Sequence, residues 1–114
     1  MLLIPPALVG RVGQAKRRPG WGFSKLMPTI AFFYGIAIRM FFRDHPPPHF
    51  LAVYGGHEAN VSIETGEIIN GHLPANAARL VKQWTLAHRA ELDDNWQRAR
   101  SNTPLVRIAG LDDD

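Results

Sequence analysis

The spacing of apolar residues changes once along this chain, and the change separates a strand-forming part from a helix-forming part. Between residues 36 and 70, apolar and polar residues alternate, which is the two-residue period of strands with one buried face. After Gly71, apolar residues recur every three or four positions, which is the period of an amphipathic helix. Strands followed by helices predict an α+β domain.

The first part predicts an antiparallel meander of four strands. In GIAIRMFFRD, apolar positions alternate with a face that carries Arg39, Phe41 and Arg43. The run HFLAVY ends at a glycine pair, and the pair Thr65 and Gly66 predicts a hairpin turn before the last strand. The predicted strands are residues 36–43, 49–54, 57–64 and 67–70.

The second part predicts two helices packed on one face of this sheet. The first follows Pro74, a residue favoured in the first turn of a helix, and the second covers about residues 90–100. Their apolar positions include Trp84 and Trp96, which we expect in the core. His88 falls on the same apolar stripe and is expected at the core edge. The other face of the sheet is left open to solvent or to a partner.

Charge divides the chain into a basic leader and a domain. The 114 residues carry a net charge of +3, but residues 1–26 alone carry five Lys and Arg and no acid. The other eight basic residues and all ten acids give residues 27–114 a net charge of −2. We expect residues 1–26 to be a disordered leader upstream of a true start at Met27; the alternative is a basic arm for nucleic acid or anionic membrane. A single domain at 27–108 and an acidic tail at 109–114 complete the expected organisation.

Several function classes lack their signatures in this sequence. The absence of cysteine removes thiolate chemistry and fits a reducing compartment, so a cytoplasmic location is expected. The apolar run at residues 1–10 is short and broken by two prolines, so no membrane segment is expected. P-loop, GxSxG, HExxH and EF-hand motifs are absent, and we predict neither a cofactor nor a metal.

The stretch DHPPPHF leaves three interpretations open. A metal site is disfavoured, because a polyproline II rod over the three prolines would hold the Cα atoms of His45 and His49 about 12 Å apart. In a second interpretation His45 or His49, with Tyr54 and nearby arginines, cleaves RNA without a metal. We favour the third, in which Asp44 and His45 cap a strand end and the prolines fix the loop.

Several quoted motifs are similar to a known family. The segments MPTIAFFYGIAIRMFF, DHPPPHF, YGG, ETGEIINGHLP and LVKQWTLAHRAELDDNWQRA resemble the bacterial domain of unknown function 4160 over about residues 27–108. The resemblance implies a fold more than an activity, since the family is uncharacterised. Its genes tend to lie beside another small gene, as in toxin–antitoxin pairs. Members usually carry His-Phe-His where this chain has His49, Phe50 and Leu51, which argues against a metal or catalytic role for that second position.

The outward side chains of the first predicted strand suggest a function. Arg39, Phe41 and Arg43, with His49 at the next strand, are predicted to form a binding surface, since arginine and aromatic residues are enriched at interfaces. The net charge of −2 and the acids of the third strand disfavour nucleic acid. We therefore predict a non-enzymatic module that binds a small protein partner or a second copy of itself, with the RNA-cleaving enzyme as the alternative.

Overall fold

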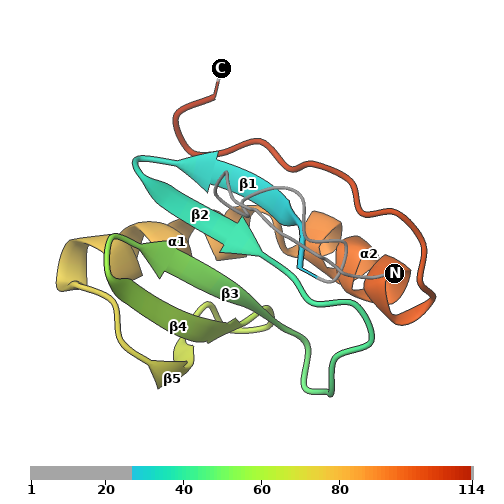
Figure 1. The fold of residues 1–114 in the computed structure, drawn as a ribbon. Coiled ribbons are helices and arrows are strands. Elements are labelled where there is room, and N and C mark those ends of the chain that lie inside the picture. The colour runs from blue at the N-terminus through green and yellow to red at the C-terminus, as the bar shows by residue number, and fades with distance from the viewer. Residues whose placement is uncertain (1–26, 114) are drawn as a thin grey trace, which may run out of the picture.

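Five antiparallel strands and two helices form residues 27–113, the part of the chain that the computed structural model describes (Figure 1). The strands lie in the sheet in chain order, which makes the sheet a meander. The predicted α+β class is therefore confirmed. The elements are β1 (Thr29–Phe33), β2 (Ile36–Arg39), β3 (His49–Tyr54), β4 (His57–Ser62), β5 (Ile68–Gly71), α1 (Ala75–Ala87) and α2 (Arg89–Arg100).

The sheet has one strand more than the sequence predicted, and the two strands predicted at residues 36–43 and 57–64 are shorter, ending at Arg39 and Ser62. The register of β1 shifts between Thr29 and Ala31, so that Ile30 and Ala31 are both buried. This irregularity removes the alternation by which β1 could have been recognised. Strand β2 ends at Arg39, and a turn follows it. In this turn Arg43 has a φ of 57° and donates its backbone N–H to the carbonyl of Ala99 at 3.1 Å.

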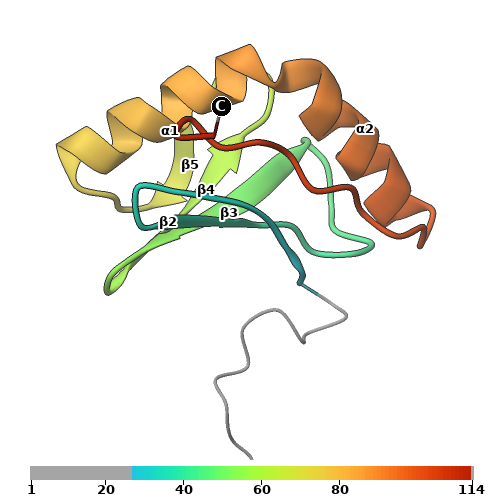
Figure 2. The same cartoon turned by 90° about the horizontal axis from the view of Figure 1, so that it is seen from above.

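Both helices lie on the same face of the sheet (Figure 2). Trp84 of α1 is fully buried, and its ring centroid lies 5.2 Å from that of Phe33 and 5.8 Å from that of Phe50. Trp96 of α2 is buried as well, so both tryptophans belong to the core as expected. The helix-facing side of the sheet contributes Ile36, Ile38, Ala52, Ala59 and Val61 to this core. Within residues 27–113 no helix has the length and apolar character needed to cross a membrane.

His88 separates the two helices and is held at the edge of the core. Its backbone N–H donates to the carbonyl of Trp84 at 3.0 Å, as the last turn of α1 requires. The imidazole lies 5.5 Å from the Trp84 ring, and its Nδ1 is 2.5 Å from a carboxylate oxygen of Glu91. The core-edge position expected from the sequence is the one observed.

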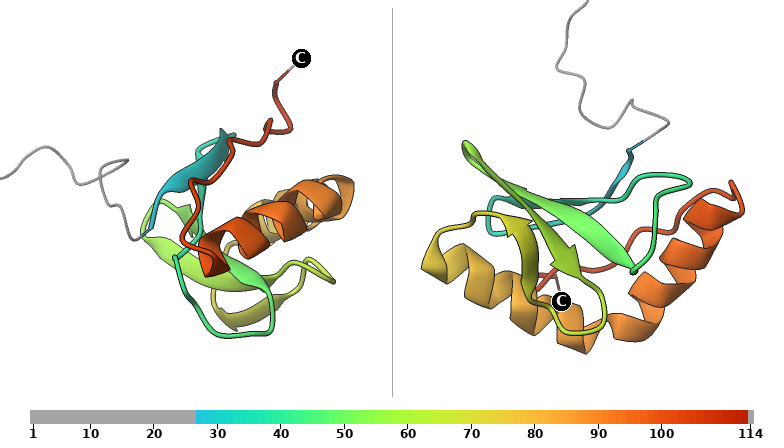
Figure 3. Two further views of the ribbon diagram at one scale, coloured as in Figure 1. Left: turned by 90° about the vertical axis from the view of Figure 1, so that its right-hand side faces the viewer. Right: turned by 90° about the horizontal axis from the view of Figure 1, so that it is seen from below.

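The chain after α2 runs in an extended conformation between β1 and the helices (Figures 2 and 3). The backbone N–H of Ile108 donates to the carbonyl of Ile30 at 2.8 Å, and the indole N–H of Trp84 donates to the carbonyl of Ala109 at 2.7 Å. Gly110 packs so closely that a Cβ there would lie 2.7 Å from the Cβ of Phe33. Packed chain thus continues past residue 108, where the sequence placed the start of an acidic tail. The expected basic leader lies outside the described residues.

Candidate functional site

The connection from β2 to β3 contains DHPPPHF and is closed by Asp44. One carboxylate oxygen of Asp44 accepts a hydrogen bond from the backbone N–H of His45 at 2.7 Å. The other lies 2.9 Å from Nε2 of His49. On the opposite side of the ring, Nδ1 of His49 lies 2.8 Å from the carbonyl oxygen of Pro47. Asp44 thus closes the loop itself and does not cap β2, which ends at Arg39, and His49 takes part in this closure in place of the His45 side chain.

These contacts occupy both ring nitrogens of His49. A carbonyl and a carboxylate both accept hydrogen bonds, so the ring satisfies both only when each nitrogen carries a proton. The ring also packs 5.4 Å from Trp96, and the side chains of His49 and Asp44 are only 16% and 22% exposed. Because each nitrogen already has a partner within the loop, His49 is placed to hold the loop on α2 and has no unpaired nitrogen for a substrate.

Of the residues of the predicted RNA-cleaving site, His45 and His49 line the same hollow, whereas Tyr54 does not. Tyr54 lies at the far end of β3 from His49, five residues away, which corresponds to about 16 Å along a strand. His45 is exposed, and its imidazole makes no hydrogen bond within residues 27–113. The bond between Pro46 and Pro47 is cis, so the separation of about 12 Å that a polyproline II rod would impose does not apply. Across the described part of the chain, no three His, Asp or Glu side chains are grouped so as to hold a metal ion.

The face of the sheet opposite the helices carries two rows of side chains that cross the strands. Strand register places Phe32, Ala37, Val53 and Glu58 in one row. The second row consists of Thr29, Arg39, Leu51, Asn60 and Asn70. We call these two rows the open face. No described helix covers it (Figure 3).

Arg39, the last residue of β2, lies in the second row of the open face, and its charge is unmatched within residues 27–113. Among the described residues its guanidinium makes neither an ion pair nor a hydrogen bond, and Nε is fully buried without an acceptor. Its cross-strand neighbours Thr29 and Leu51 are not charged. A buried donor without an acceptor is uncommon in a folded domain, because it lowers stability by about 1–3 kcal/mol.

Apolar side chains of the open face lie on the strands to either side of Arg39, and polar side chains follow on β4 and β5. On β1 the ring of Phe32 is 53% exposed, while Leu51 and Val53 of β3 are half-buried. On β4 and β5 the Nδ2 of Asn60 donates to Oδ1 of Asn70 at 2.7 Å. The amides continue into a hollow of about 220 Å³ whose lining residues include Asn60, Asn70, His45 and Ile69. The open face thus offers apolar contact, one cation and amide groups side by side.

Sequence reasoning predicted part of the open face. Arg39 is on β2 as expected, whereas Phe41 and Arg43 lie beyond the end of the strand, in the connection to β3. Both are exposed, Phe41 by 40%. Phe32 was missed because β1 was not predicted. The sequence signal for β1 is the Phe32–Phe33 pair, since neighbouring residues of a strand point to opposite faces and here one ring is buried and the other exposed.

Comparison with known proteins gives a family and no characterised relative. No curated protein and no solved structure gives a significant match to the sequence. The model of the family described as domain of unknown function (DUF4160) matches residues 35–97, from the turn before β2 into the last turn of α2. Since this match covers more than half of the chain, the protein belongs to the DUF4160 family, as the motifs predicted.

Proposed function

We propose that this protein is a non-enzymatic binding module whose open face contacts a small protein partner, with Arg39 as the anchor. The observation that carries the proposal is the guanidinium of Arg39, whose buried Nε has no acceptor among residues 27–113. Arginine presents five donors in a planar fork, which matches the two oxygens of a carboxylate. The partner chemistry that follows is an acidic side chain set among apolar groups.

The surroundings of Arg39 support a protein partner over nucleic acid. The exposed ring of Phe32 and the half-buried Leu51 and Val53 supply the apolar contact that protein interfaces bury around a polar anchor. Glu58 lies at the end of the first row, where its charge would repel phosphate. Residues 27–114 also carry a net charge of −2, which disfavours a polyanion.

The gene arrangement implied by the resemblance supports the same proposal. Members of the family resemble one half of a toxin–antitoxin-like pair, in which two small cytoplasmic bacterial proteins bind each other. The partner we propose is the product of such a neighbouring gene. The alternative, an RNA-cleaving enzyme, lacks a supporting observation, because His49 has no free nitrogen and Tyr54 lies at the opposite end of β3.

The test is affinity capture from native lysate by the tagged full chain. Three proteins are compared: the wild type, the double variant Arg39→Ala, Phe32→Ala, and the control Val106→Ala, Arg107→Ala. The control removes one arginine and one apolar side chain that are also exposed but lie on the segment after α2. We expect a stoichiometric small protein with the wild type and the control, and at least about tenfold less with the open-face variant.

The same samples distinguish the binding module from the RNA-cleaving enzyme. Absorbance at 260 and 280 nm reports copurifying RNA, and His45→Ala tests the one loop histidine with a free ring. Capture that is equal for the open-face variant and the wild type contradicts the binding proposal. RNA that copurifies and whose fragments lengthen in His45→Ala supports the enzyme instead.

A further inference from the structure

Two histidines meet at an edge of the sheet away from the DHPPPHF loop. His57 is the first residue of β4, and His72 directly follows β5. Their ring centroids are 5.4 Å apart, with an angle of 66° between the ring planes. Both residues are exposed, and neither imidazole makes a hydrogen bond to another described residue. Their nitrogens are therefore available for binding.

This separation fits two imidazoles that share one tetrahedral metal ion. With metal–nitrogen bonds of about 2.0–2.1 Å and tetrahedral angles, the centroids of two such rings lie about 5 Å apart. A simple edge-to-face contact of the rings accounts for the distance as well, but it leaves four ring nitrogens without a protein partner. Neutral imidazole is the preferred protein ligand of several divalent transition ions.

The backbone fixes the two histidines relative to each other. The N–H of His72 donates to the carbonyl of Glu58, the residue after His57, at 2.9 Å. Gly71 makes this approach possible, since it has a φ of 88° and a Cβ there would lie 2.4 Å from the carbonyl oxygen of Glu58. Both ligands thus start from main chain held in a five-stranded sheet, so little ordering is required on binding.

We propose that His57 and His72 form a two-ligand site for a divalent transition ion of the Zn²⁺ type. Within residues 27–113 no third His, Asp or Glu completes the set, so two positions of the ion remain for water or for a ligand from outside the chain. Such an open site binds ions less tightly than a closed structural site with four protein ligands. Because the pair lies outside the open face, the proposal is independent of the proposed function.

The test is calorimetric titration of Zn²⁺ into the untagged full chain at pH 7.5. We expect one ion per chain, with an association constant at least about tenfold lower in His57→Asn and in His72→Asn. His45→Asn is the matched control, since His45 is also exposed and its ring is also unpaired; its titration should match the wild type.

A second measurement assigns the ligands directly. Zn²⁺ should shift the side-chain ¹⁵N resonances of His57 and His72 in the wild type and leave those of His45 in place. Both histidines are exposed, so thermal unfolding without metal should be the same in each variant and the wild type. Absence of binding, or equal affinity in wild type and both variants, overturns the proposal.

Discussion

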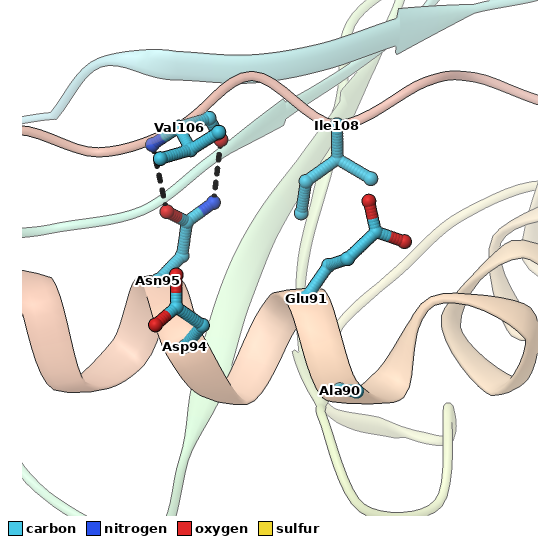
Figure 4. Close-up of a pocket in the computed structure, with 6 residues that line it drawn as sticks. All are labelled: Ala90, Glu91, Asp94, Asn95, Val106 and Ile108. Carbon is cyan, nitrogen blue, oxygen red and sulfur yellow. Dashed lines mark hydrogen bonds between the residues drawn. The ribbon is translucent and has the colours of Figure 1, made fainter.

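The buried side chain of Asn95 in α2 helps to hold the segment that follows this helix. Its Nδ2 donates to the carbonyl of Val106 at 2.7 Å, and its Oδ1 accepts from the N–H of Val106 at 2.8 Å (Figure 4). The carboxamide thus takes the place of a neighbouring strand for one residue. Beside it is a hollow of about 230 Å³, whose lining includes Val106 and Ile108.

The first prediction concerns Asn95→Ala. The change removes both hydrogen bonds in a fully buried position, so the free energy of unfolding should fall by about 1–3 kcal/mol. Chemical denaturation measures this loss. Gln97→Ala, on the exposed side of the same helix, should change it by less than about 0.5 kcal/mol. Equal effects of the two substitutions would show that the Val106 contact does not hold the segment.

A second residue-scale prediction separates the two loop histidines. His49→Leu leaves the Asp44 carboxylate without its ring partner at a site where the aspartate is only 22% exposed, so it should lower the free energy of unfolding by about 1–3 kcal/mol. His45→Ala removes an exposed ring without a partner and should change it by less than about 0.5 kcal/mol. Denaturant melts of the two variants decide this. A larger loss in His45→Ala contradicts the role given to His49.

At the scale of elements, β5 depends on the close approach of Gly71 to β4. Its φ of 88° is unfavourable for residues with a side chain, and a Cβ there would lie 2.4 Å from a backbone oxygen. Gly71→Ala should therefore lower the free energy of unfolding by more than about 2 kcal/mol. Gly56→Ala is the control, because a Cβ at Gly56 meets nothing within 4 Å; there stability should stay within about 1 kcal/mol of wild type. A tolerated Gly71→Ala would mean that β5 pairs differently.

The periodicity of apolar residues predicted the helices, each of which buries one regular apolar face. It did not predict β1, where an irregular strand register breaks the period. The stripe of α1 around Trp84 and that of α2 around Trp96 repeat regularly, so both helices were predicted. The irregular register of β1 places Ile30 and Ala31 both in the core, and no two-residue period survives there. The packing of the segment after α2 was not predicted, because its backbone is held by side chains distant in sequence, such as Trp84.

The candidate site divides in the same way. Arg39 was predicted because it alternates with buried residues of a regular strand. Tyr54 was placed with the loop histidines because it is only five residues from His49 in the sequence. In an extended strand those five residues put it at the opposite end of β3. The hydrogen bonds of His49 to Asp44 and Pro47 depend on the path of the loop, which no local pattern encodes.

For the whole molecule, the two faces of one sheet have different roles. The helices and the segment after them cover one face and supply the core, with Trp84 at its centre. No described element covers the other face, which retains exposed Phe32 and unmatched Arg39. The stability of the domain therefore comes mainly from the helix-covered side, and under the proposed function the open face would serve binding at some expense in stability.

Arg39→Met tests this division. Methionine has a similar length without polar donors, so it removes the buried unmatched Nε and should raise the free energy of unfolding by about 1 kcal/mol. The same change removes the proposed anchor, so capture of the partner should fall at least about tenfold. Arg107→Met, at an exposed arginine on the segment after α2, should leave both quantities unchanged. A loss of stability in Arg39→Met would mean that the guanidinium is required by the fold, and the unmatched charge would no longer argue for a partner.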